Sequence, residues 1–234
     1  MADYRLHDAE ANTKFGLYLS AVERQALIRA HEMTPAPTLA MDVGVGGGRW
    51  SYLLRERGWK IICTDIHPVT ISHCHGLMPE ATCVLVQPTD TSLPCGTGEA
   101  GIIVCLEVFQ VVGASWFIAE SSRILSDGGL IVGEFNNKWS WRGVLHHAVS
   151  RFLGKFDYYS KSYLTWKREL RDIGLEIVFE VGLAWFPLGR RSNSPLVEWG
   201  ARLERVLGLR RLPNFSPTVV FIARKKAVVE RPST

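Results

Sequence analysis

The sequence contains no apolar run close to the ~20 residues that a bilayer-spanning helix needs, so we expect no transmembrane segment. Residues 1–10 carry charges of both signs and lack an apolar stretch, which argues against a secretory signal. Internal repeats and low-complexity tracts are also absent. With 47% hydrophobic residues, the chain of 234 residues can bury a sizeable core, and a globular protein is expected.

Cysteine is scarce and irregularly spaced. The five cysteines make an odd number and form no paired metal-binding or disulfide spacing, so we expect reduced thiols in the cytoplasm, mostly filling the core. The triplet His73-Cys74-His75 resembles a metal motif only superficially. Alternate residues can share an ion in an extended segment, whereas this stretch has a helical pattern, so no metal site is expected.

Charge is unevenly distributed along the chain. Residues 1–135 hold 9 lysines and arginines against 15 acids, while residues 136–234 hold 18 against 8. The basic half favours an anionic or membrane-associated acceptor or surface, although a solvated arginine-rich face is an equal alternative. Basic runs interleaved with aromatic residues are lacking, so no nucleic-acid partner is expected. The oligomeric state is left open.

Short apolar runs alternate with helical stretches after a first helix at residues 11–31. We predict strands at 38–43, 60–64, 82–86, 101–106, 130–135, 175–181 and 218–223. Helices are predicted at 49–57, 68–77, 115–125, 139–156, 163–173 and 196–207. This alternation indicates an α/β fold: a Rossmann-like, doubly wound, mainly parallel seven-stranded sheet with helices on both faces and an antiparallel last strand.

The expected organisation is a single domain over residues 1–234. It comprises an N-terminal helical cap (1–37), a ligand-binding core (38–135), an inserted helical region (136–173), C-terminal strands and a helix (174–226), and a tail (227–234). The inserted region is rich in aromatic and basic residues. It is interpreted as a lid, as a basic amphipathic helix resting on a membrane, or as the core-facing side of helices that cover the sheet edge.

The most informative segment is Ala40–Trp50, in which an apolar strand runs into four glycines and then a helix. Glycine lets the backbone turn sharply and approach a ligand closely, because no Cβ intervenes. Asp65 ends the next strand, 21 residues after Gly44, where a carboxylate can bind both hydroxyls of a ribose. The two features together predict a ligand that contains adenosine.

Two details argue against a dinucleotide. The G-x-G-x-x-G fingerprint requires glycine at its sixth position, but counting from Gly44 that position is Arg49. Asp42, two residues before Gly44, would repel a pyrophosphate and suits a cationic ligand group instead. An NAD(P)-dependent oxidoreductase is therefore the less favoured enzyme class.

The segment Asp42–Gly48 resembles the first motif, D-x-G-x-G-x-G, of the class I S-adenosylmethionine (SAM)-dependent methyltransferases. Further segments in family order are similar to its later motifs: Cys63–Pro68, Gln87–Pro94, Cys105–Gln110 and Arg123–Leu130. The resemblance implies that S-adenosyl-L-methionine is the cofactor. It also implies cofactor contacts for Asp42, Gly44, Gly46, Gly48, Asp65, Ile66, Asp90, Thr91 and Glu107.

Within these contacts the family pattern assigns separate roles. Asp42 and the loop would hold the methionine end, Asp65 the ribose, and Asp90 the adenine amino group, with Thr91 beside the ring. Glu107 would lie near the methyl group. Gln110 stands where many relatives have a histidine, so acceptor contacts there do not transfer.

Because a sulfonium already activates the methyl group, the protein mainly has to align the acceptor for in-line displacement. If a general base is used, the candidates are Glu107, His67, His73, His75, His146 and His147, of which Glu107, His146 and His147 are the catalytic candidates. The predicted function is methyl transfer, as O-methylation, to a small-molecule or lipid-linked acceptor. A catalytically inactive SAM-fold binding protein is the alternative from another class.

Overall fold

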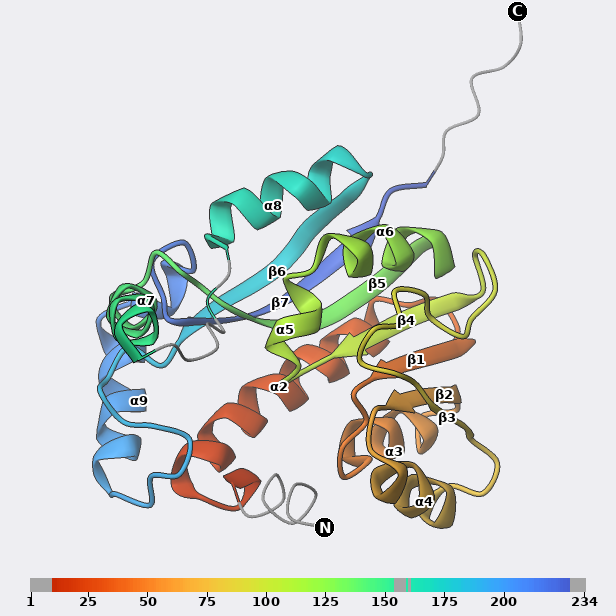
Figure 1. Ribbon diagram of the computed structural model, residues 1–234, viewed down its shortest axis with the longest axis horizontal. Coiled ribbons are helices and arrows are strands. Elements are labelled where there is room, and N and C mark those ends of the chain that lie inside the picture. The colour runs from red at the N-terminus through yellow and green to blue at the C-terminus, as the bar shows by residue number, and fades with distance from the viewer. Residues whose placement is uncertain (1–9, 154–158, 160, 228–234) are drawn as a thin grey trace, which may run out of the picture.

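The computed structural model describes residues 10–153, 159 and 161–227. Its centre is a seven-stranded sheet in the order β3-β2-β1-β4-β5-β7-β6 (Figure 1). The strands are β1 (Leu39–Val43), β2 (Lys60–Asp65), β3 (Thr82–Leu85), β4 (Ala100–Cys105), β5 (Leu125–Asn136), β6 (Leu175–Leu183) and β7 (Thr218–Lys225). β7 is antiparallel to both of its neighbours, and the other adjacent pairs are parallel. The predicted fold class is confirmed.

The middle of the sheet explains where a ligand can bind. All six residues of β4 are buried, as expected for a parallel strand covered on both faces. The strand order reverses between β1 and β4, with β2 and β3 on one side and the later strands on the other. Connections leave such a switch point in opposite directions, which opens a crevice at the carboxyl ends of the strands.

Helices cover both faces of the sheet (Figure 1). They are α2 (Lys14–Glu32), α3 (Arg49–Arg55), α4 (Pro68–Leu77), α5 (Phe109–Val112), α6 (Ser115–Ile124), α7 (Trp141–Leu153), α8 (Tyr163–Asp172), α9 (Leu196–Val206) and the 3-10 helix η1 (Leu209–Arg211). The sequence periodicity does not predict α5, because one turn is too short to show a helical pattern. Within the described ranges, no helix is long and apolar enough to cross a bilayer.

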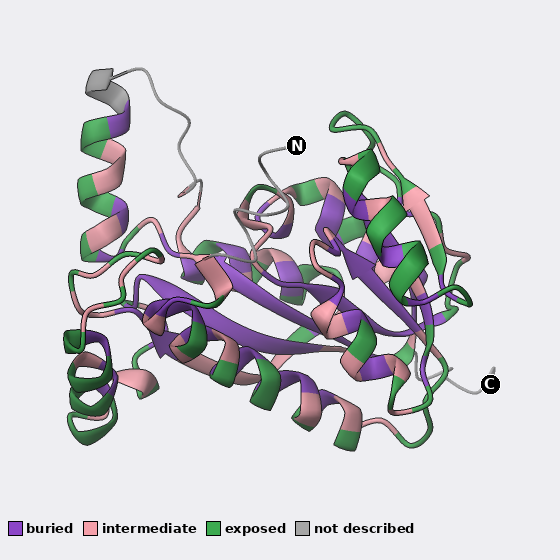
Figure 2. Cartoon of the chain, turned by 90° about the horizontal axis from the view of Figure 1, so that it is seen from below, coloured by how far each residue is buried: buried purple, intermediate pink, exposed green. Residues whose placement is uncertain are grey.

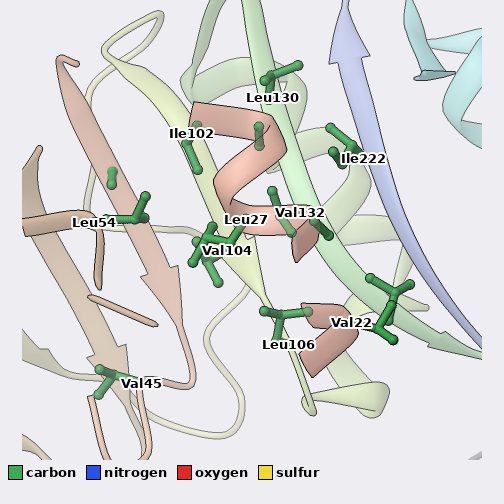
Figure 3. Close-up of a cluster of buried hydrophobic side chains, with 14 of the residues drawn as sticks. Val22, Leu27, Val45, Leu54, Ile102, Val104, Leu106, Leu130, Val132 and Ile222 are labelled. Atoms are coloured by element: carbon green, nitrogen blue, oxygen red, sulfur yellow. The ribbon is translucent and has the colours of Figure 1, made fainter. Parts of the chain in front are cut away.

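Apolar side chains form a core on each face of the sheet. On one face, Leu27 of α2 and Leu54 of α3 pack in the cluster that includes Val104 of β4 (Figure 3). On the other face, Phe117 of α6 and Trp166 of α8 belong to a second cluster. Full burial of one such side chain contributes roughly 1.5–3 kcal/mol to the free energy of unfolding, so the two cores fix the sheet against its helices.

The aromatic residues of the inserted region separate into two groups. Tyr163 and Trp166 of α8 are buried and stacked, with ring centroids 5.7 Å apart, so the core-facing interpretation is confirmed for them. Trp139 and Trp141 instead have exposed fractions of 74% and 42%. Phe152, Phe156 and Tyr158 of the same aromatic region lie outside the residues whose side chains the structure describes.

For α7, the core-facing interpretation is wrong, because its apolar face points to solvent. Val144 and Leu145 are 61% and 58% exposed, while Gly143 and Ser150 are buried. A Cβ on Gly143 would lie 2.4 Å from the backbone oxygen of Asn137, so only glycine allows this close approach. The contact turns the small-residue side of α7 inward. In Figure 2, α7 is the helix that runs into a grey segment and stands away from the sheet.

Candidate functional site

The loop between β1 and α3 depends on glycine for its shape. Gly44, Gly46 and Gly48 have φ values of 75°, 50° and 76°, a region that side chains with a Cβ rarely adopt. A Cβ on Gly44 would also lie 2.5 Å from Cγ2 of Val108. The N–H of Gly44 donates to the backbone oxygen of Thr64 at 2.9 Å, which ties the loop to the end of β2.

Asp65 lies at the end of β2 and holds the glycine loop while still lining the cleft. Its Oδ2 accepts a hydrogen bond from the N–H of Gly46 at 3.2 Å. Its Oδ1 accepts from the backbone N–H of His67 at 2.9 Å and lies 3.0 Å from Nδ1 of the same residue. A carboxylate has about four lone-pair sites, so it keeps capacity for the hydroxyls of a ligand.

Asp42 lies behind the loop and is not among the residues that line the cleft. It is 4% exposed, and its Oδ2 accepts a hydrogen bond from Oγ of Ser51 at 2.6 Å. Burial raises the pKa of Asp42 to about 6, and the hydrogen bond from Ser51 opposes this shift. The charge of Asp42 therefore acts on a ligand from behind the loop.

The raised pKa of Asp42 predicts a pH-dependent stability. Because this pKa lies above the ordinary value of 3.8, the folded protein binds the proton more tightly than the unfolded chain does. The free energy of unfolding should therefore fall as the pH rises from about 4 through about 6, by roughly 3 kcal/mol from this group. Asp42→Asn, which keeps an acceptor for Ser51, should flatten this part of the profile in urea unfolding. Parallel profiles for the variant and the parent would contradict the prediction.

A cleft of about 290 Å³ lies at the carboxyl ends of β1, β2 and β4. It brings together most of the residues that the family resemblance selected: Gly44, Gly46, Asp65, Ile66, Asp90 and Glu107. Gly48 faces away from it, since a Cβ there would lie 3.3 Å from the side chain of Leu77. Thr91 is exposed and does not line the cleft.

The polar candidates beyond β2 occupy different positions. Asp90 closes the turn after β3, where its Oδ2 accepts from the backbone N–H of Gln87 at 2.7 Å. His146 and His147 lie on α7 and do not line the cleft. Nδ1 of His146 lies 3.2 Å from Oγ of Ser150 instead. Histidine is present in the cleft as His67, beside Asp65.

Sequence reasoning missed a network of three acids and two arginines next to the cleft. One guanidinium nitrogen of Arg49 lies 3.1 Å from Oε2 of Glu23 and 3.3 Å from Oε1 of Glu107. Arg190 reaches Glu107 at 3.0 Å and Glu134 at 2.8 Å. One signal was available, because Glu134 interrupts an apolar strand, and a charge on such a strand requires a buried partner.

The acids of this network lie where ionisation of a carboxylate is unfavourable. Burial raises the pKa of Glu23 well above its ordinary value, and repulsion from Glu107 and Glu134 adds to the shift. Burial also raises the pKa of Glu134, although the charge of Arg190 opposes this. One carboxylate oxygen from each of the three acids lies within 4.8 Å of those from the other two. The guanidiniums already neutralise much of this charge, so the cluster does not require a metal ion.

Glu107 belongs to this network and also has an unusual backbone conformation. Its φ is 62°, which costs a residue other than glycine of the order of 1–3 kcal/mol. Such strain persists only where the surroundings hold it, and here both Arg49 and Arg190 bind the carboxylate. Since Glu107 also lines the cleft, the strained position points toward the ligand site.

The triplet His73-Cys74-His75 lies within α4, as the helical pattern predicts. Cys74 is buried while both histidines are exposed, so the three side chains do not converge. Sγ of Cys63 lies 3.3 Å from those of Cys74 and Cys83, which forms a cluster of three thiols behind the loop. All five cysteines are free, as expected.

The strand order and the cleft at the β1/β4 switch point define a Rossmann-like α/β fold with a nucleotide-type ligand site. Residues 41–133 match the family model described as "Methyltransferase domain". Over these residues the chain is similar to the class I SAM-dependent methyltransferases, an enzyme class whose cofactor is S-adenosyl-L-methionine. No curated protein matches the sequence significantly.

Solved structures agree with this fold. A putative methyltransferase of Haloferax volcanii, solved with its Trm112 activator, has a TM-score of 0.60 and 18% identity over 89% of this chain and 90% of its own. A putative sarcosine dimethylglycine methyltransferase of Galdieria sulphuraria gives 0.61 and 16% over 90% and 86%. A geranyl diphosphate C-methyltransferase of Streptomyces coelicolor gives 0.62 and 15% over 88% and 82%. At these identities, the likeness concerns the fold.

Proposed function

We propose that this chain transfers the methyl group of S-adenosyl-L-methionine to an oxygen atom of a small-molecule or lipid-linked acceptor. The observation that carries the proposal is the meeting of the glycine loop, Asp65 and Glu107 in one cleft. Two of the structural relatives are named for small acceptors, which supports a small molecule here. One of those names specifies carbon as the acceptor atom, so the preference for oxygen rests on this chain's own residues.

The preference for oxygen follows from charge. The guanidinium of Arg49 lines the cleft next to Glu107, and a guanidinium attracts an oxygen that carries negative charge. A phosphate, a carboxylate or a hydroxyl that is losing its proton can bind this guanidinium, whereas a protonated amine is repelled by it. The basic half of the chain, residues 136–234, supports an anionic or membrane-associated acceptor in the same way.

The cofactor-binding roles are proposed as follows. The carboxylate of Asp65 accepts hydrogen bonds from the ribose hydroxyls, and the turn closed by Asp90 receives the adenine amino group, with Ile66 near the ring. The glycine loop approaches the methionine end with its backbone. Asp42 attracts the ammonium group of that end through its charge and fixes α3 through Ser51.

When bound, the cofactor supplies a methyl group that its sulfonium already activates. The acceptor oxygen attacks the methyl carbon in line as the carbon–sulfur bond breaks, and the sulfur keeps the electron pair. The proton of a hydroxyl acceptor passes to a carboxylate or to solvent. Glu107 lines the cleft but is engaged by two guanidiniums, so we assign it first to positioning. His146 and His147 can serve only an acceptor that extends to α7.

Calorimetric titration tests the class of ligand. The purified protein should bind S-adenosylhomocysteine saturably and should not bind a reduced nicotinamide cofactor. Incubation with methyl-labelled SAM and extracts of small molecules and lipids should then yield a labelled product that mass spectrometry identifies. Saturable binding of the nicotinamide cofactor alone would favour an oxidoreductase. Binding of S-adenosylhomocysteine without turnover on any fraction would favour the inactive binding protein.

A further inference from the structure

Helix α9 presents a continuous apolar stripe to solvent. The spacing of its residues places them on one side of the helix, within an arc of about 100°. Their exposed fractions run from 56% to 75%: Leu196 61%, Trp199 68%, Leu203 56%, Val206 75% and Leu207 60%. Monomeric soluble proteins seldom expose several large apolar side chains side by side, and contiguous patches of this kind mark interaction sites.

The outward orientation of this stripe is fixed by the opposite face of α9. Val197 is fully buried, and Glu204 is 1% exposed. The carboxylate of Glu204 accepts hydrogen bonds from the hydroxyl of Tyr18 at 2.5 Å and from the backbone N–H of Trp185 at 2.7 Å. Rotating α9 to bury the stripe would break both bonds, so the apolar face cannot turn into the core.

Helix α7 carries a second exposed apolar face at the same end of the molecule (Figure 1). It comprises Trp141, Val144, Leu145 and Val149, which are 42% to 61% exposed, together with Trp139 just before the helix. One segment joins the two helices. Nε1 of Trp141 donates to the backbone oxygen of Trp185 at 3.2 Å, and the ring of Phe186 packs closely against α9 at Gly200.

Positive charge lies next to the stripe of α9. Arg202 and Arg205 are exposed on α9, and Arg211 is exposed at the end of η1. In the described part of the chain, no ion pair involves these three arginines. Helices α7 and α9 both follow strands whose carboxyl ends lie at the cleft edge, so the charge and the apolar side chains share that edge.

We propose that this α7–α9 surface (Trp139, Trp141, Val144, Leu145, Val149, Leu196, Trp199, Leu203, Val206 and Leu207, with Arg202, Arg205 and Arg211) binds the surface of an anionic lipid bilayer. The apolar side chains enter the headgroup region, where tryptophan is favoured, and the arginines bind lipid phosphates. A second copy of the chain is a poorer occupant, because a symmetric contact would bring the arginines of both copies together.

The inference deepens the proposed lipid-linked acceptor, because it places the cleft edge against the membrane that would hold such an acceptor. Only this link to the acceptor rests on the proposed function, whereas the binding of a bilayer does not. Binding of vesicles and binding of S-adenosylhomocysteine are measured separately, so either proposal can fail while the other stands.

Vesicle sedimentation tests the surface. The protein should sediment with vesicles of phosphatidylcholine and phosphatidylglycerol and at least about 10-fold less with phosphatidylcholine alone, and added salt should weaken the binding. The variant Trp199→Ser/Val206→Ser should lose at least about 10-fold in partitioning. Arg202→Gln/Arg205→Gln should lose most of the dependence on salt and on anionic lipid.

Leu164→Ser is the matched control, because Leu164 is also an exposed apolar residue, 45% exposed, but lies on α8. This variant should sediment like the parent, and all variants should bind S-adenosylhomocysteine with parental affinity if they fold. The proposal is overturned if the parent ignores anionic vesicles at low salt or if Leu164→Ser is as defective as the α9 variant. It is also overturned if light scattering shows a dimer that Trp199→Ser/Val206→Ser abolishes.

Discussion

Replacing Asp65 by alanine is expected to weaken the binding of S-adenosylhomocysteine about 100-fold. The proposed carboxylate contacts to two ribose hydroxyls are charge-assisted hydrogen bonds of about 1.5 kcal/mol each. Their loss accounts for the expected change in affinity. The variant also loses the acceptor that holds the N–H of Gly46, so the glycine loop should be less well ordered for the ligand.

Isothermal titration calorimetry measures this effect, with Asp172→Asn as the control. Asp172 is an exposed acid at the end of α8 and does not line the cleft, so its variant should bind like the parent. Urea unfolding of both variants separates a loss of contact from a loss of folding. Unchanged affinity in both Asp65→Ala and Asp42→Ala would overturn the placement of the cofactor.

Replacing Arg190 by methionine is expected to lower the free energy of unfolding by about 3 kcal/mol. Arg190 is the cation that Glu134 binds, at 2.8 Å, and Glu134 is fully buried in β5. Removing the guanidinium leaves a carboxylate with neither water nor a counter-charge. Because the folded-state pKa of Glu134 is raised, its ionisation costs stability as the pH rises, so the defect should shrink on acidification.

A double-mutant cycle in urea checks the pairing. Glu134→Gln/Arg190→Met should be more stable than Arg190→Met alone, since it removes the uncompensated charge. Arg191→Met is the matched control: Arg191 is 75% exposed, and its ion pair with Glu10 should be worth less than about 1 kcal/mol. Equal losses of unfolding free energy in Arg190→Met and Arg191→Met would show that the buried pair stabilises the fold no more than the exposed pair does.

The sheet could be predicted from the sequence because each strand is marked by the residues of the strand itself and of the turn that follows it. The apolar run through β1 is typical of a buried parallel strand, and the glycines that follow it predict a tight turn that approaches a ligand closely. Asp65 could be located because its role follows from the position at a strand end. The one-turn helix α5 could not be predicted, since four residues carry no periodicity.

The missed features depend on contacts between distant parts of the chain. Glu23, Glu107 and Arg190 come from α2, from the end of β4 and from the loop after β6, and nothing local in the sequence announces their meeting. An apolar pattern like that of α7 marks a buried face in most helices of globular proteins. Here the backbone contact of Gly143 with Asn137 overrides that pattern.

The ion pairs of Arg190 have a consequence for where the protein can be divided. The segment 41–133 that matches the family model contains Glu107, but its buried neighbour Glu134 and the cation that joins them lie outside it. β5 would also lose its antiparallel neighbour β7 if the chain were cut there. The stretch that is recognisable by sequence therefore lacks buried partners of β5, and we expect the segment 41–133 to be less stable alone than the whole chain.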